Sequence, residues 1–170
     1  MERKLATVLF VDLVGSTEFV AARDPEIVRR RVNSYFEHVS HCITTHGGIV
    51  EKFAGDAVMA AFGIPQAHED DAERAVRAAA AILDSVHGLG LEARIGVEAG
   101  EVVADETDST FATGEAVNVA ARLQQSADPG EILIGPLARR LTLPILATEE
   151  LAPIDAKGFG EPILAWRLVA

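Results

Sequence analysis

The chain has 170 residues, of which 49% are hydrophobic and 24% charged, and its formal net charge is −11. These values are typical of a single globular domain, here residues 1–170, and exclude a disordered chain. The acidic balance argues against binding along nucleic acid, which needs clustered Lys and Arg. A small nucleotide substrate is compatible with this charge where local cations, such as metal ions, offset the repulsion.

Cys42 is the only cysteine, so no intramolecular disulfide can form, which fits a cytoplasmic location. The apolar run 5–11 follows charged residues as in a signal peptide, but Asp12 interrupts it and no small-residue cleavage site follows. The alanine-rich stretch 75–83 is too short to span a bilayer. We therefore expect a cytoplasmic protein without a membrane segment.

Apolar runs bounded by turn residues alternate with amphipathic stretches along the chain. In chain order they predict a strand at 5–13, a helix opened by 15–17, a helix from 24–26 to 46, a hairpin at 49–63, a helix from 68–71 to 87, one long strand or a strand pair at 92–103, a helix at 114–126, a strand at 131–134, a helix at 136–141 and two strands within 145–169. Hairpins mixed with crossover helices indicate an α+β fold. We expect a ferredoxin-like palm with extensions, in which a central, mostly antiparallel sheet is flanked by helices.

Asp12 interrupts an otherwise apolar strand and precedes the Gly-Ser-Thr turn at residues 15–17. A carboxylate at the end of a central strand is costly to desolvate unless it is paired or bound to a cation. The turn offers backbone N–H groups at a helix N-terminus, where anions bind. A metal-bridged triphosphate needs this combination, although such turns are common and the pattern alone is weak.

Lys52 and Asp56 lie in the predicted hairpin, near its Gly55-Asp56 turn. Taken alone, the pair is explained by an aspartate that satisfies turn amides and a lysine that solvates an edge strand. The alternative is a carboxylate that holds a metal and an ammonium that binds a nucleotide. Asn118 and Arg122, spaced i, i+4, share one face of a predicted helix, and their spacing alone favours two surface residues.

Four stretches in this order together resemble the class III nucleotidyl cyclase catalytic domain over essentially the whole chain. They are Phe-Val-Asp-Leu-Val-Gly-Ser-Thr at 10–17, Glu-Lys-Phe-Ala-Gly-Asp at 51–56, Gly-Glu-Ala-Val-Asn-Val-Ala-Ala-Arg-Leu at 114–123, and Lys-Gly at 157–158. Four ordered motifs are far more specific than any one of them.

The resemblance implies that Asp12 and Asp56 bind two divalent cations, Mg²⁺ or Mn²⁺, and that the backbone carbonyl of Leu13 is a further ligand. It also implies that three backbone amides hold phosphate, those of Gly15, Ser16 and Thr17. The implied reaction is that of an adenylyl cyclase. The ribose 3′-hydroxyl of ATP attacks the α-phosphorus in line, which gives 3′,5′-cyclic AMP and pyrophosphate.

The remaining implied roles concern the base, the ribose and the outer phosphates. Lys52 would select the purine, Asn118 would orient the ribose, Arg122 would stabilise charge on the α-phosphate, and Lys157 would contact the terminal phosphates. The resemblance further implies a head-to-tail homodimer, in which the metal aspartates of one chain face the base, ribose and α-phosphate residues of the other. A regulatory domain or protein outside this chain would control it.

The pattern departs from the family at Phe111, where many members carry a hydrogen-bond acceptor for the base. A phenylalanine cannot accept that bond, so relaxed ATP/GTP selectivity is one alternative. A catalytically weak or inactive nucleotide-binding or dimerisation module is another, although both metal aspartates and the Lys, Asn and Arg are retained. A diguanylate-type cyclase is disfavoured, because Ala54-Gly55-Asp56-Ala57 replaces that family's Gly-Gly-Asp/Glu-Glu-Phe turn.

Overall fold

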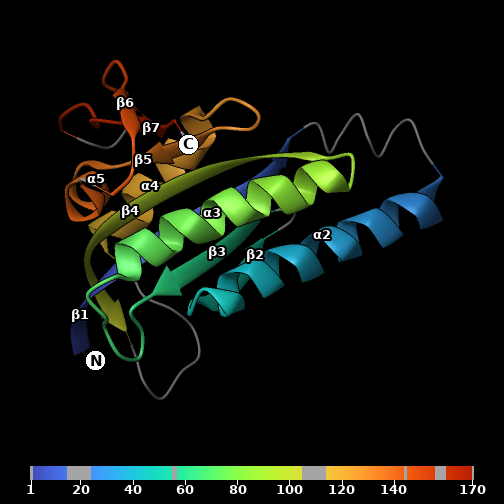
Figure 1. Cartoon of the computed structure of the whole chain (residues 1–170), viewed down its shortest axis with the longest axis horizontal. Coiled ribbons are helices and arrows are strands. Elements are labelled where there is room, and N and C mark those ends of the chain that lie inside the picture. The colour runs from blue at the N-terminus through green and yellow to red at the C-terminus, as the bar shows by residue number, and fades with distance from the viewer. Residues whose placement is uncertain are drawn as a thin grey trace.

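A computed structural model describes residues 2–14, 24–54, 57–104, 114–143, 145–155 and 160–169. The described strands form one seven-stranded sheet in the order β2-β3-β1-β4-β5-β7-β6 (Figure 1). The strands are β1 (Glu2–Val14), β2 (Ile49–Ala54), β3 (Ala57–Phe62), β4 (Glu92–Ala104), β5 (Ile132–Ile134), β6 (Thr148–Glu150) and β7 (Trp166–Leu168). The helices are α2 (Pro25–Thr45), α3 (Asp71–Gly88), α4 (Glu115–Ser126) and α5 (Pro136–Thr142).

All strand pairs are antiparallel except β4 with β5, so the predicted α+β fold with a mostly antiparallel sheet is confirmed. The predicted segment 92–103 is one long strand. It pairs with β1 over thirteen residues without a register shift, from Glu2 opposite Ala104 to Val14 opposite Glu92. This strand pair lies in the interior of the sheet, between β3 and β5.

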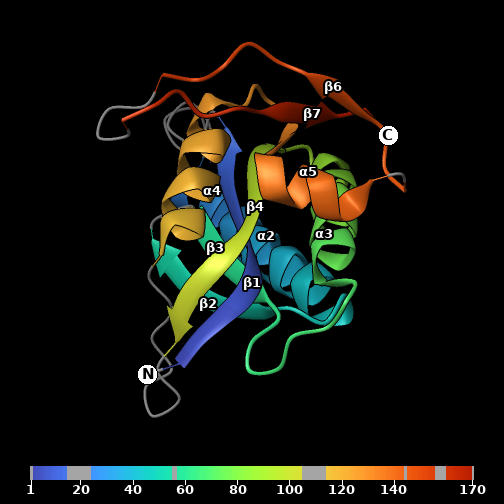
Figure 2. The same cartoon turned by 90° about the vertical axis from the view of Figure 1, so that its left-hand side faces the viewer.

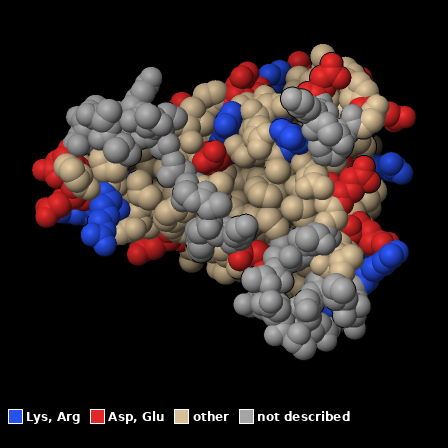
Figure 3. Space-filling view, turned by 180° about the vertical axis from the view of Figure 1, so that it is seen from behind, with Lys and Arg blue, Asp and Glu red and all other residues tan. Residues whose placement is uncertain are grey.

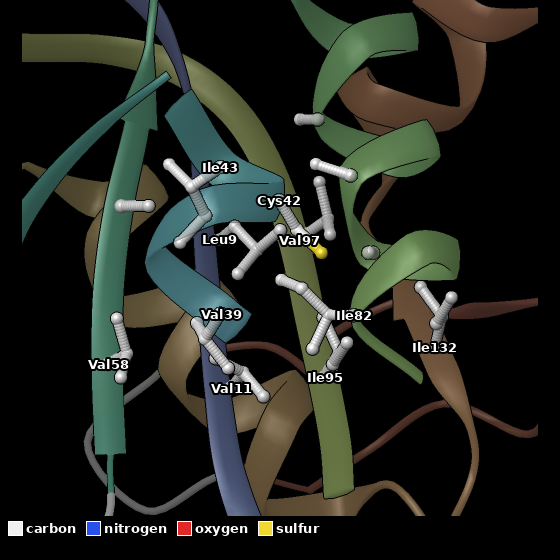
Figure 4. Packing of buried hydrophobic residues seen from close by; sticks show 14 of the residues in the cluster. Leu9, Val11, Val39, Cys42, Ile43, Val58, Ile82, Ile95, Val97 and Ile132 are labelled. Atoms are coloured by element: carbon white, nitrogen blue, oxygen red, sulfur yellow. The ribbon is translucent and has the colours of Figure 1, made fainter. Parts of the chain in front are cut away.

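Helices α2 and α3 cover one face of the sheet, and α4 lies on the other (Figures 1 and 2). Because strand side chains alternate between faces, Leu9, Val11 and Leu13 of β1 point into the core beneath α2 and α3. Figure 4 shows this core, in which residues such as Val39, Ile82 and Ile95 meet from both helices and the sheet. Within the described segments, no helix is both long and apolar enough to cross a membrane.

The ends of α2 follow the sequence signals. The Asp24 side chain accepts a hydrogen bond from the Glu26 N–H at 2.8 Å, and Pro25 occupies the first turn, as predicted. Gly47 ends the segment with a φ of 87°, which a residue with a side chain rarely adopts.

Two glycines bring α4 unusually close to β4. A Cβ at Gly96 would lie 2.3 Å from the Ala120 carbonyl oxygen, and one at Gly100 would lie 3.0 Å from the Ala116 Cβ. These two glycines therefore mark points of close approach between the strand and the helix. The close packing fixes α4 directly over the strand pair that carries Asp12.

Candidate active site

Asp12 lies near the end of β1, directly opposite Arg94 of β4. Val8, on the same side of β1, packs with Ala116 and Ala120 of α4. By alternation Asp12 and Arg94 therefore project from the α4 face of the sheet. Directly opposed residues of an antiparallel pair have Cβ atoms about 4.5–5.5 Å apart. A half-buried carboxylate and a guanidinium thus lie at the same end of the β1–β4 strand pair.

The C-terminal end of α4 reaches this same end of the sheet. The Arg94 guanidinium donates to the Gln125 carbonyl oxygen at 2.9 Å. Arg122 donates to the Gln125 side-chain oxygen at 3.1 Å. Asp12, Arg94 and Arg122 are therefore linked by one strand pairing and two hydrogen bonds, all within a single chain.

Asn118 lies one helical turn before Arg122 and is exposed, as the i, i+4 spacing predicts. Leu13 is only 7% exposed and its side chain packs in the core, so it could contribute a metal ligand only through its backbone. The carboxylate strand and the Asn/Arg helix thus lie on the same side of the sheet, and the catalytic roles of their residues stay predictions.

The β2–β3 hairpin is present, with an irregularity that the sequence does not reveal. Val50 pairs with Ala60 but Lys52 pairs with Met59, so Glu51 is an extra residue that forms a bulge. Burial raises the pKa of the Glu51 carboxyl. Bulges redirect the residues beside them, and this one immediately precedes Lys52.

Several predicted site residues lie outside the described part of the chain, so their roles stay predictions. These residues are Gly15, Ser16, Thr17, Asp56, Phe111 and Lys157, and for Lys52 only the backbone is described. Within the described ranges no group of three or more His, Cys, Asp or Glu side chains could hold a metal ion. Asp56, the second expected carboxylate, lies outside these ranges.

Arg94 is a candidate site residue that the motifs did not single out. Its signal was an arginine in the apolar run Ala93–Val97, two residues before Gly96. Burying a cation in an apolar strand costs free energy unless it has an anionic partner, just as burying an anion does without a cation. A charged residue inside an apolar strand, which marks Asp12 as a candidate, therefore also marks Arg94 within residues 92–103.

Glu98, on the same face of β4, is buried for a different reason. Its Oε1 accepts hydrogen bonds from the N–H groups of Ala99 at 2.8 Å and of Ala138, in α5, at 2.9 Å. Burial raises the pKa of Glu98 although these N–H groups favour its charged form. Glu98 therefore holds the start of α5 to the sheet.

A cleft of about 950 Å³ lies beside Glu98, between α4, α5 and residues 160–164. It follows the outer half of β4, from Glu98 to Val103, and so lies away from Arg94 and Asp12. On the side of the molecule opposite α2 and α3, charged side chains of both signs surround a broad uncharged area (Figure 3). This distribution differs from the continuous basic stripe of nucleic-acid-binding proteins.

Known proteins resemble this chain in both sequence and structure. Residues 2–165 match the family described as the adenylate and guanylate cyclase catalytic domain. The solved adenylyl cyclase CyaB from Pseudomonas aeruginosa is 29% identical, with a TM-score of 0.92 over 99% of this chain and 95% of CyaB. The guanylyl cyclase Cya2 is 28% identical, with a TM-score of 0.88 over 98% of this chain and 92% of Cya2.

An uncharacterized protein of Mycobacterium tuberculosis is 38% identical over 141 residues. The match covers 78% of this chain but 26% of that relative, so the chain spans about a quarter of the length of such proteins. Because the family match covers nearly all of the chain and the fold agrees with it, this protein belongs to the adenylate and guanylate cyclase family and is a nucleotidyl cyclase domain.

Proposed function

We propose that this domain is an adenylyl cyclase, which converts ATP to 3′,5′-cyclic AMP and pyrophosphate. The observation that carries the proposal is the placement of Asp12 directly opposite Arg94, a carboxylate and a guanidinium of one chain on one face of the sheet, while α4 on that face presents Arg122 toward a second copy. A carboxylate for cations beside arginines for phosphate is what this reaction needs, because its charge develops on phosphate oxygens. It needs no nucleophilic side chain, since the attacking group is the substrate's own hydroxyl.

The oxygen donors at the site fit divalent cations. Asp12 supplies a half-buried carboxylate on the α4 face and Leu13 a backbone carbonyl, and hard cations such as Mg²⁺ prefer oxygen ligands. Asp56 would complete the set. When bound, two such ions would make the 3′-hydroxyl a better nucleophile and offset the charge of the triphosphate.

The chain's own residues would supply orientation and charge. Arg122 would donate a planar fork of N–H groups to oxygens of the α-phosphate as negative charge develops there. Arg94, held by the Gln125 carbonyl, presents a second guanidinium to the phosphate chain beside Asp12. Asn118 would hold the ribose so that its 3′-oxygen faces the α-phosphorus, and Lys157 would hold the terminal phosphates.

The α4 face also supports a homodimer with shared sites. Asn118 is exposed there, and half-buried Phe10 and Val117 pack at the edge of the small cluster beneath α4. The broad uncharged area of Figure 3 lies on this side of the molecule. A second copy would cover it and would place its own Asn118 and Arg122 against the Asp12 end of the first chain.

The choice of ATP follows from Lys52, since guanylyl cyclases of this family typically carry Glu there. Both an adenylyl and a guanylyl cyclase are similar to this chain at nearly equal identity, so the base must be tested directly. The purified domain should be assayed with ATP and GTP, each with Mg²⁺ or Mn²⁺. We expect cyclic AMP, with a specific activity that rises with protein concentration. No cyclic nucleotide at any protein concentration would overturn the proposal.

Site sharing has its own test. Asp56→Ala and Arg122→Ala should each be inactive alone, because each destroys both sites of a homodimer. A mixture should regain activity, since one site of the heterodimer keeps all wild-type residues. Confirmed heterodimers without activity would overturn site sharing and leave the cyclase assignment to the first assay.

A further inference from the structure

The chain ends in a long hairpin, here called the C-terminal arm, formed by residues 148–155 and 160–168. Beyond the β6–β7 pairing, the Leu151 N–H donates to the Ala165 carbonyl at 3.0 Å. Ile154 and Ile163 exchange two backbone hydrogen bonds of 2.8 Å. In the sequence, Lys157 lies between the two segments of this arm.

The arm packs along α4. Val119 and Leu123 of the helix and Ala127, which follows its last residue, form one buried cluster with Ile163 and Ala165 of the arm. Leu151 and Ile154 pack against the edge of the same cluster. The helix that carries Asn118 and Arg122 therefore packs against the two described segments that flank residues 156–159 in the sequence. Backbone pairing ties β7 to β5 at two positions, Arg167 opposite Leu133 and Trp166 opposite Ile134. Further along the arm the packing on α4 is apolar and non-directional, so it does not by itself fix the arm's position along the helix.

The Glu131 carboxylate links the end of α4 to the C-terminal arm through hydrogen bonds, which depend on direction. The Glu131 Oε1 accepts the Asp128 N–H at 2.8 Å, just after α4, and its Oε2 accepts an N–H of Arg167, on β7, at 2.7 Å. Arg167 also donates to Glu149 of β6 at 2.5 Å. The turn after α4 and both strands of the arm thus meet at one guanidinium.

This network is stronger than an ordinary surface ion pair. The Glu131 side chain is only 17% exposed, and Arg167 uses two N–H groups on two carboxylates. Burial raises the pKa of Glu131, but the hydrogen bonds from Arg167 and from the Asp128 N–H outweigh burial, and the net pKa is lowered. Glu131 is therefore ionised at neutral pH, and the network is intact there.

We propose that Glu131 and Arg167 are positioning residues that set the C-terminal arm in register with α4, so that Lys157 and Arg122 reach the two ends of one triphosphate. The inference rests on the proposed function and adds residues that touch no substrate. Lys157 would bind the terminal phosphates in the ground state as well as in the transition state. A displaced arm should therefore weaken substrate binding more than turnover.

The kinetic test uses Glu131→Gln and Arg167→Met, with Arg167→Lys as the conservative variant. We expect KM for the nucleotide to rise about tenfold, less than the hundredfold that a 1 Å misplacement of reacting groups can cost. Inhibition by inorganic tripolyphosphate should weaken in parallel, kcat should be retained, and Arg167→Lys should restore part of the loss. Glu73→Gln, which breaks the 3.0 Å Glu73–Arg77 pair on α3, is the matched control and should leave KM unchanged.

A merely structural role would give a different result. Loss of folded protein lowers the apparent kcat and leaves KM in place, and that outcome would overturn the proposal. The mixed Asp56→Ala and Arg122→Ala heterodimer adds a positional test. Glu131→Gln should raise KM when placed in the Asp56→Ala chain, which donates the working α4, and have no effect in the other chain. Equal effects from both chains would contradict coupling within one chain.

Hydrogen exchange separates this inference from the proposed function. In Glu131→Gln and Arg167→Met, the N–H groups of Leu151, Ile154 and Ile163 should exchange faster than in the parent, while the amides of α3 are unchanged. Unchanged exchange in the arm would overturn the coupling even in an active enzyme. An inactive parent would overturn the proposed function, whereas the exchange result would still decide whether the arm is registered on α4.

Discussion

Two acidic residues on the same face of the sheet, Asp12 and Glu98, have opposite environments. Glu98 is 6% exposed, and the backbone N–H groups of Ala99 and Ala138 satisfy it. Asp12 is half-buried, close to the end of its strand, and faces the cation of Arg94. Both are carboxylates in apolar strands, yet only one is fully enclosed by the chain itself.

The difference in burial and in hydrogen-bond donors distinguishes a structural carboxylate from one that is placed to bind a ligand. Backbone N–H groups that belong to the fold satisfy the Glu98 carboxyl, so Glu98 holds α5 to the sheet. At the Asp12 end, a half-buried carboxylate lies opposite an arginine near the end of the strand pair, where a metal ion or a phosphate could reach them. The following predictions test this contrast, from the largest expected effect to the smallest.

Asp12→Asn should lower kcat by about 10²–10³-fold, as the loss of one electrostatic group at a reacting centre typically does. The thermal midpoint should change little, because the side chain keeps its size and is half-buried. Cyclic nucleotide production and thermal unfolding are the two measurements. Glu101→Gln, at the exposed far end of β4, is the control. Wild-type turnover in Asp12→Asn would remove Asp12 from the site.

Arg94→Met should weaken transition-state binding by about 1.5–3 kcal/mol, which is roughly 10- to 150-fold in kcat/KM. The activity falls because a charged donor beside Asp12 is lost. The lost hydrogen bond to the Gln125 carbonyl is exposed and should have little effect on stability. Arg3→Met is the matched control, because Arg3 lies at the other end of β1 and forms an exposed 3.4 Å pair with Glu101. Equal kcat/KM values for the two variants would make Arg94 a structural residue.

Gly96→Ala should destabilise the fold by about 1–3 kcal/mol, because the new Cβ would overlap the backbone of α4. It should lower activity as well, since α4 must move away from the Asp12 end of the sheet. Gly88→Ala is the control: no atom lies within 4 Å of the added methyl, and it should gain about 0.4–1 kcal/mol. Denaturant unfolding measures both. A Gly96→Ala protein as stable as the parent would contradict the close approach.

Glu98 should make a small contribution to the pH dependence of stability. Its folded-state pKa is raised above the ordinary value of 4.5, so the folded state binds the proton more tightly than the unfolded state. The stability of the parent relative to Glu98→Gln should therefore be greatest below pH 4.5 and fall as pH rises toward the folded-state pKa. Denaturant unfolding between pH 4 and 7 measures this difference. A difference that is independent of pH would show that burial does not control this carboxyl.

The order of strands and helices was predictable because each apolar period and turn signal acts locally. Asp24 with Pro25 marks the start of α2, and Gly47 marks its end. Asp12 and Arg122 were identified from motifs whose chemistry is visible in the sequence. The bulge at Glu51 and the Arg94–Gln125 contact were not, since both depend on strand pairing and on how α4 packs. The Glu131–Arg167 contact joins residues 36 positions apart and has no local signal.

The unbroken pairing of β1 with β4 also limits which changes in chain length the domain can tolerate. Side chains alternate with a period of two, so deleting one residue between Leu9 and Asp12 would turn the carboxylate into the core beneath α2 and α3. A deletion of two would restore its face but displace it by about 7 Å along the strand. For this domain the number of residues in its central strands is under the same constraint as the identity of Asp12 and Arg94.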